Sequence, residues 1–582
     1  MVPFLYVPVN RIPLAPTGKT DRRRLKALGA SLTAEDLAKF KGVENKPKRD
    51  PSTALERQVR DLWAEILAIP PDRIGIDDNF LQLGGDSISA MRLLSLARAR
   101  GLSLDSRNLF ISGSTLADLA AKVSHASAAA VNHHQVPFSQ LQTRDIQGFL
   151  MANIAPHIDY PASSIDDAFP VTDFQAECIN AAIHQKPPAY WNYFYIDLPM
   201  SDLTIDAVSA ACQAVAMHLP ILRSVFVPYG SDFLQLVTID LTPEFSWFRS
   251  TAKDIATTSE RLAREDWLNS HVRTGTVFAR FMLILADDES SGARLIIRMS
   301  HALYDGISLG PLLHAVVAAI EGRPLPSVGS FASFVQHLVA MRGEASRYWG
   351  KLLSGSSMTQ MPRVPRANND VGGSTPYIVR RTIRWQTSLP EGVTAATFCT
   401  ACWAAVIAFT TQQADVVFGR LVSGRGPTLG VISEPVAGPC LNVIPVRVTW
   451  PPRELHTVYS PHEVFATIQQ QQLDGLPFES TGLSQIIASC TDWPADTAFG
   501  SIFQYQNIDE TPSASLNGAP VHLDAIPMDF RPKQLWVLVK PLAQGLNVSL
   551  FGTTGIMAQE HAQTLGDQFC KYVEMGGMLQ DM

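Results

Sequence analysis

The chain has 582 residues, more than one hydrophobic core can organise, so several domains are expected. Hydrophobic residues make up 46% of it and charged residues 17%, which is typical of globular domains and not of long disordered tracts. The net charge of -7 argues against a nucleic-acid partner, and no apolar stretch is long enough for a membrane span or a secretion signal. Seven scattered cysteines are typical of reduced thiols, so we expect a cytoplasmic protein without a membrane partner.

The first block, residues 1–45, contains the pair Gly18-Lys19. This pair lacks the earlier glycine that a phosphate-binding loop of the G-x-x-x-x-G-K type requires. The segment from Pro13 to Arg22 instead resembles the last core motif of adenylation domains, P-x-x-x-x-G-K-x-D-R, whose lysine contacts the substrate carboxylate. Nothing upstream could form a nucleotide pocket. We therefore interpret this block as the C-terminal remnant of an adenylation domain, with Lys19 as an orphan of that family's site.

The second block, residues 51–125, has the pattern of a small helical domain. Apolar residues recur at helical spacing from Leu55 to Leu67, and a further helix is expected from Ser114 to Val123. With a second amphipathic helix and a short helical turn between these two, the block is expected to be an all-α bundle of four helices.

The segment Gly85-Asp86-Ser87 in this block stands at the start of a helix. A serine there commonly caps the helix, but the unpaired amides of a helix N-terminus also suit a phosphate ester. The phrase from Asp78 through Leu94 resembles peptidyl carrier (thiolation) domains. This resemblance implies that Ser87, flanked by Gly85 and Asp86, receives 4'-phosphopantetheine from coenzyme A through a phosphopantetheinyl transferase.

Two pairs of potential metal ligands receive structural interpretations. His133 and His134 are adjacent and cannot both face one ion, so they are assigned to a linker spanning residues 126–164. Cys399 and Cys402 form a C-x-x-C, but they lie in an apolar run with helical spacing, which favours core packing. No metal site is therefore predicted.

The third block, residues 165–582, alternates strand-like and helical runs. This pattern predicts α/β layers in two lobes, an N-lobe at about 165–340 and a C-lobe at about 341–582. The strand-like runs are Ala279–Ala286, Arg294–Met299 and Trp536–Val539, and the helical ones include Ala207–Ala216 and Ala395–Phe409.

After the predicted strand Arg294–Met299 the chain continues as Ser300-His301-Ala-Leu-Tyr-Asp305-Gly306. The order offers an imidazole for proton exchange, a carboxylate to fix the local backbone and a residue tolerant of unusual torsions. A histidine that ends a strand by chance is the alternative. The stretch resembles the His-His-x-x-x-Asp-Gly signature of nonribosomal peptide condensation domains, with Ser300 in place of the first histidine.

Seven further segments resemble condensation-domain motifs and occur in the family's order. The resemblance implies two chloramphenicol-acetyltransferase-like lobes with a tunnel between them and His301 at its middle. The segments are Phe169–Gln175, His218–Phe226, Arg347–Trp349, Asp415–Gly419 with Gly424-Arg425, Asn442–Pro445, Pro477-Phe478 and Phe503–Asn507.

The same resemblance implies roles for the loop residues. His301 either takes the proton from an amine that attacks a thioester or mainly orients that amine. Asp305 is expected to be structural, paired with a cation that could be Arg223, although His218-Leu219 replaces the Arg-His that opens the family's motif. Gly306 would allow a backbone amide to approach the developing oxyanion.

The Ser-His-x-x-x-Asp-Gly form resembles in particular the terminal domains of fungal synthetases, including those that make fumiquinazoline-type alkaloids. We expect that upstream synthetase modules deliver a peptidyl thioester held on Ser87 and that its own amine releases it as a macrocycle near His301. Intermolecular condensation with an amine or alcohol acceptor, as in siderophore synthetases, stays open. A non-catalytic docking platform is a third hypothesis, against which the retention of His301, Asp305 and Gly306 argues.

Overall fold

The structure is a computed structural model that describes most of the chain. The remnant expected at 1–45 with Lys19, and the residues Asp86, Ser87, His133 and His134, lie outside the described residues. The described residues are 48–67, 69–80, 83, 85, 89–90, 93–94, 96–97, 100–104, 114–125, 136–141, 143–198, 204–251, 254–287, 292–362, 374–385, 389, 393–426, 435–450, 461–508, 511–528, 531–542 and 545–576.

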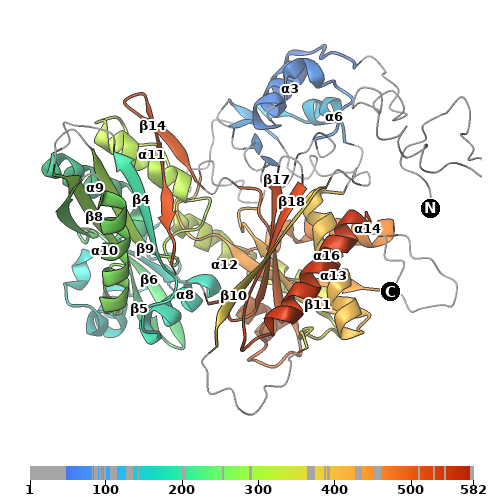
Figure 1. Ribbon diagram of the computed structural model, residues 1–582. Coiled ribbons are helices and arrows are strands. Elements are labelled where there is room, and N and C mark those ends of the chain that lie inside the picture. The colour runs from blue at the N-terminus through green and yellow to red at the C-terminus, as the bar shows by residue number, and fades with distance from the viewer. Residues whose placement is uncertain are drawn as a thin grey trace, which may run out of the picture.

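The carrier block forms a small helical domain, drawn in blue in Figure 1. The predicted helix at Leu55–Leu67 is confirmed, and the second predicted helix begins with a capping box between Thr115 and Asp118. A short antiparallel ladder, which the sequence did not predict, closes the domain. Its elements are α3 (Ala54–Leu67), η1 (Pro71–Arg73), β1 (Leu102–Ser103), α6 (Leu116–Ala121) and β2 (Ser124–His125).

The N-lobe contains a five-stranded sheet with strand order β16-β4-β9-β8-β7 and a three-stranded sheet with order β3-β6-β5. Two of the predicted strands, β8 and β9, form the centre of the larger sheet. The strands are β3 (Ile165–Pro170), β4 (Trp191–Leu198), β5 (Ser224–Tyr229), β6 (Asp232–Thr238), β7 (Glu244–Ser250), β8 (Ala279–Ala286), β9 (Ala293–Ser300) and β16 (Asp524–Ile526). The helices are α8 (Asp173–His184), α9 (Ile205–His218), η5 (Pro220–Arg223), α10 (Ile255–Asn269) and α11 (Leu309–Ile320).

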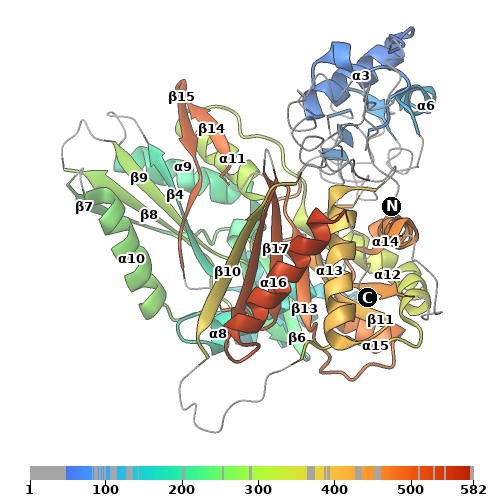
Figure 2. The same ribbon diagram turned by 45° about the vertical axis from the view of Figure 1, so that its right-hand side comes forward.

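The two faces of the larger sheet differ in chemistry. One face is apolar, with Phe194, Leu283 and Ile297 buried in the core. The other face carries aromatic and charged side chains, and there Tyr193 donates a hydrogen bond to Asp266 of α10 over 2.6 Å. Helix α10 therefore covers the mixed face, as Figure 2 shows. This alternation along each strand follows from the period of two of an extended chain.

The second half of the expected linker is packed against the N-lobe. Leu150 and Ile154 are buried in one cluster with Val227 and Leu234. The expected boundary at residue 165 therefore lies inside a packed unit. Its elements are α7 (Ile146–Phe149), η2 (Leu150–Ile154), η3 (Ala155–His157) and η4 (Ala162–Ser164).

The C-lobe is built on a six-stranded sheet with order β10-β18-β17-β13-β11-β12. The predicted C-x-x-C helix is α13, and both its cysteines are buried in the core of this lobe. The strands are β10 (Pro376–Ile383), β11 (Asp415–Val422), β12 (Asn442–Thr449), β13 (Ser501–Tyr505), β17 (Leu535–Leu542) and β18 (Gly545–Thr553). The helices are α12 (Phe331–Leu353), α13 (Ala395–Thr411), α14 (Pro461–Gly475), η8 (Leu476–Phe478), α15 (Leu483–Cys490) and α16 (Gln559–Glu574).

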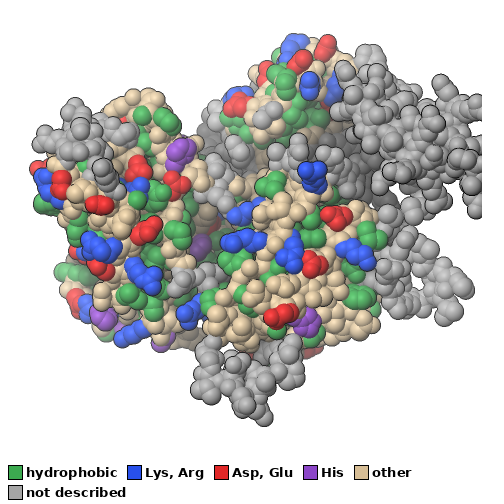
Figure 3. Space-filling model, in the orientation of Figure 1, with side chains coloured by type: hydrophobic (Ala, Val, Ile, Leu, Met, Phe, Trp, Pro, Cys, Tyr) green, Lys and Arg blue, Asp and Glu red, His purple; other side chains and the backbone are tan. Residues whose placement is uncertain are grey.

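The chain passes from the N-lobe to the C-lobe, returns to the N-lobe after β13, and ends in the C-lobe. The expected division near residue 340 falls inside the single helix α12. Later, a hairpin of β14 (Ser513–Leu516) and β15 (Ala519–His522) lies against α11, and β16 then adds an antiparallel strand to the edge of the N-lobe sheet at β4. The segment 513–526 thus belongs to the N-lobe in space. Acidic and basic side chains are interspersed over the face of both lobes seen in Figure 3.

Candidate active site

The backbone of the His301 loop is fixed on both sides. Strand β9 ends at Ser300, as predicted, and the Ser300 amide donates to the Phe278 carbonyl over 3.0 Å. The His301 amide donates to the Tyr190 carbonyl over 2.8 Å. The Ser300 side chain is fully buried, and its hydroxyl oxygen accepts the Ala302 amide at 3.2 Å. The serine that replaces the signature's first histidine therefore supports the loop backbone.

The imidazole of His301 is partly exposed and held by aromatic neighbours. Its Nδ1 lies 2.8 Å from the Tyr304 carbonyl oxygen, which can only accept, so Nδ1 carries the hydrogen and Nε2 keeps a free lone pair. The ring stacks on Tyr304 with centroids 4.5 Å apart, and Phe174 meets it edge-on at 5.0 Å. Burial lowers the pKa of His301 from its ordinary value, against smaller opposing effects of the Tyr304 carbonyl and Asp305. The arrangement thus presents a neutral base at Nε2.

Asp305 is buried and joins the two lobes. Its Oδ1 accepts a hydrogen bond from the Ser308 amide at 3.0 Å, which closes the turn that follows the His301 loop. Its Oδ2 accepts the amides of Cys440 at 2.9 Å and Leu441 at 3.2 Å, and the guanidinium of Arg425. The carboxylate is therefore saturated by donors and holds the loop in place.

The expected pairing of Arg223 with Asp305 is wrong. Arg223 donates instead to the carbonyls of Ala216 at 3.1 Å and Ile239 at 3.3 Å, within its own lobe. The cation beside Asp305 is Arg425, which also donates to two backbone carbonyls of the C-lobe. The sequence did contain a signal for it, because Gly424-Arg425 is one of the motif segments.

Gly306 faces a side chain of the other lobe. Its φ is not positive, so no unusual torsion explains the glycine. A Cβ at this position would instead stand 2.9 Å from Cδ1 of Ile508, which follows β13 of the other lobe. The glycine makes space for a close approach of the two lobes. The contact of its amide with an oxyanion stays a prediction.

A buried glutamine connects the first motif with the His301 loop. Gln175 on α8 donates to the Ala302 carbonyl at 2.9 Å and to Gln235 at 2.7 Å, and its own carbonyl oxygen accepts the Thr172 amide. In the sequence this glutamine ends the motif segment Phe169–Gln175, but the sequence alone predicted no role for it. The capping-box spacing from Thr172 to Gln175 was the available signal.

Of the expected attachment segment Gly85-Asp86-Ser87, the structure describes Gly85. Gly85 donates its amide to the Phe80 carbonyl at 2.9 Å, and a Cβ there would stand 2.3 Å from the Phe80 ring. Phe80 in turn packs edge-on against Trp63 in the domain core. The chain is thus folded tightly against the domain core at Gly85.

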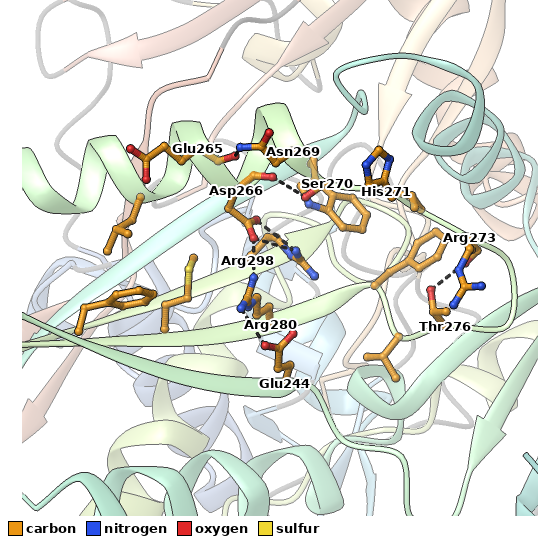
Figure 4. Close-up of a pocket in the computed structure, with 17 residues that line it drawn as sticks. Glu244, Glu265, Asp266, Asn269, Ser270, His271, Arg273, Thr276, Arg280 and Arg298 are labelled. Carbon is orange, nitrogen blue, oxygen red and sulfur yellow. Dashed lines mark hydrogen bonds and ion pairs between the residues drawn. The ribbon is translucent and has the colours of Figure 1, made fainter. Parts of the chain in front are cut away.

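A separate pocket of about 570 Å³ lies under α10, on the mixed face of the N-lobe sheet. Figure 4 shows Arg280 between Glu244 and Asp266, and Arg298 beside it. Asp266 accepts from Arg280 at 2.8 Å and from Arg298 at 3.1 Å, and Arg280 also donates to Glu244. These charges neutralise one another, so we interpret the pocket floor as a network that stabilises the sheet.

Comparison with known proteins identifies the two domains. The model of the family described as "Condensation domain" matches residues 166–550, and that described as "Phosphopantetheine attachment site" matches residues 57–123. This chain belongs to the condensation-domain family. A relative, the nonribosomal peptide synthetase apmB of Penicillium brevicompactum, is 35% identical over 531 residues, which cover 90% of this chain and 22% of that protein. The chain therefore spans about a fifth of the length of this synthetase.

Solved structures share the condensation-domain fold. One titled "The crystal structure of CT" is 25% identical with a TM-score of 0.64, covering 77% of this chain and 100% of its own. The starter condensation domain of rhizomide synthetase RzmA is 16% identical with a TM-score of 0.57, covering 71% and 97%. The expected two-lobed fold after a carrier domain is thus confirmed. Within the described ranges, no helix combines the length and apolar character needed to cross a bilayer.

Proposed function

We propose that this chain releases a peptidyl thioester by intramolecular amine attack, as the terminal part of a nonribosomal peptide synthetase. The observation that carries the proposal is His301, whose Nδ1 is fixed on the Tyr304 carbonyl so that Nε2 is left as a neutral base. The carrier domain in the same chain supports it, because a carrier brings the thioester substrate. Upstream modules would supply the peptide, and a phosphopantetheinyl transferase with coenzyme A would prime Ser87.

The proposed reaction is the attack of an amine on a thioester, and it needs one group that accepts and returns a proton. A 4'-phosphopantetheine arm on Ser87 would supply the thiol that holds the peptide as a thioester. The amine nitrogen attacks the thioester carbonyl, a C–N bond forms, and Nε2 of His301 accepts the proton that the nitrogen loses. The C–S bond then breaks, and the same proton goes to the departing sulfur. Asp305 and Ser300 keep the loop in place and take no part in proton transfer.

The test is to load the carrier with a synthetic peptidyl-pantetheine and identify the released product by mass spectrometry. A cyclic product is expected. A product that forms only with an added amine or alcohol would indicate intermolecular condensation, and a purely linear acid would contradict cyclisation. Ser87→Ala should abolish loading, and His301→Ala should leave loading intact but stop release. His314→Ala, an exposed histidine on α11, is the matched control and should release normally.

A further inference from the structure

Helix α8 lies on the side of the N-lobe that faces the C-lobe (Figure 1). Its first turn places Phe174 edge-on against the His301 imidazole, with ring centroids 5.0 Å apart. The residue before it, Asp173, accepts from Ser484 of α15, at 2.7 Å from the amide and 2.6 Å from the hydroxyl. One turn of helix thus contacts both the reacting histidine and the opposite lobe.

Tyr190 is a second neighbour of the His301 loop. Its carbonyl accepts the His301 amide at 2.8 Å, and its ring packs edge-on against Phe174 at 6.3 Å. Its φ of 57° lies in the left-handed region, which a residue other than glycine adopts only where its surroundings hold it. The hydroxyl of Tyr190 provides such a hold, because it donates to the Glu177 carboxylate at 2.9 Å.

Glu177 carries the connection to the C-lobe. It lies on α8 one turn after Phe174, and the same oxygen that accepts from Tyr190 accepts from Nζ of Lys533 at 3.1 Å. Lys533 lies two residues before the start of strand β17 of the C-lobe sheet. A continuous set of contacts therefore runs from the C-lobe sheet through Lys533, Glu177 and Tyr190 to the backbone of His301.

We propose that Tyr190 is a positioning residue for His301, and that Lys533 acts on it through Glu177. The position of the imidazole then depends on the contact between the C-lobe and α8. Release of the product is slowed when that contact is lost. This proposal rests on the proposed function, because it requires His301 to act in release. Asp305 fixes the end of the loop, whereas this set of contacts fixes its beginning.

The expected effects follow from the type of bond removed. Tyr190→Phe keeps the ring but removes a hydrogen bond to a charged acceptor, and should slow release about tenfold. Lys533→Gln removes one exposed partner of an ion pair and should slow release about two- to fivefold. Lys533→Arg retains the charge and should recover the rate. The double variant should be no slower than Tyr190→Phe alone, because both changes interrupt the same connection.

The experiment is single-turnover release from the full chain, loaded with the same peptidyl-pantetheine, with thermal melting of each variant alongside. Arg261→Gln, which removes an exposed ion pair of α10 with Glu265, is the matched control and should release at the wild-type rate. Unchanged rates in both Tyr190→Phe and Lys533→Gln would overturn the proposal. Independent, multiplying effects of the two changes would overturn it as well, since they indicate general destabilisation.

A failure of the proposed function can be distinguished from a failure of the positioning proposal by the release rate of His301→Ala. If His301→Ala releases product as fast as wild type, the histidine does not act in release, and the positioning proposal falls with it. If His301→Ala stops release while Tyr190→Phe and Lys533→Gln match the Arg261→Gln control, only the positioning proposal is refuted.

Discussion

Replacing Arg425 by methionine should destabilise the condensation domain by about 3 kcal/mol. The side chains of Arg425 and Asp305 are 9% and 2% exposed. Removal of one partner of a buried ion pair costs about 3–5 kcal/mol, because the remaining charge stays where water cannot solvate it. Asp305 would keep the amides of Cys440 and Leu441 as donors, at 2.9 and 3.2 Å. These remaining bonds place the expected cost at the lower end of that range.

Urea denaturation followed by tryptophan fluorescence measures this loss as a shift of the unfolding midpoint. Arg381→Met is the matched control, because it removes an exposed ion pair with Asp567 and should cost about 1 kcal/mol at most. Arg425→Lys retains a charge without the branched donor group and should fall between wild type and Arg425→Met. The reasoning is refuted if Arg425→Met destabilises the protein no more than Arg381→Met does.

Three further predictions concern the loop and the carrier. Gly306→Ala should cost about 1 kcal/mol, the low end for added volume at a packed site, because the new Cβ would stand 2.9 Å from Cδ1 of Ile508, the far end of a side chain that can shift; Gly310→Ala, with open space around it, should cost nothing, and equal melting curves would contradict the packing argument. The pH–rate profile should contain a His301-dependent rise that lies below the ordinary range of histidine, because only neutral His301 accepts a proton and burial lowers its pKa; the attacking amine must also lose its proton and adds its own rise at higher pH, so the contrary result is a His301-dependent rise above the ordinary range of histidine. Gly85→Ala should unfold the carrier and abolish loading with labelled coenzyme A, because its Cβ would overlap the Phe80 ring; normal loading of this variant would show that the turn can relax.

Periodic patterns were sufficient to predict several of the regular elements. The apolar run Ala279–Ala286 is strand β8, and the helical spacing of Ala395–Phe409 became α13. Such elements are predictable because alternation with a period of 2 or 3.6 reports directly on which face is buried. The His301 loop was predictable for another reason, since its residue types at fixed spacing belong to one short stretch of chain.

The contacts between distant segments could not be predicted in the same way. Arg425 is 120 residues from Asp305, and no local pattern states which cation meets a buried carboxylate. Gly306 illustrates a second difficulty, because a glycine in a sequence signals either an unusual torsion or a need for space. Only the position of Ile508 from the other lobe decides between the two.

The return of strand β16 to the N-lobe has a consequence for synthesis of the chain. Strand β4 at the sheet edge pairs with β9 on one side and with β16 on the other, and β16 is made only after most of the C-lobe. Until then the nascent N-lobe presents an unpaired edge, the kind of surface that pairs with other chains and aggregates. A ribosome stalled before residue 524 would therefore hold an N-lobe whose β4 edge is still open to pairing with other chains.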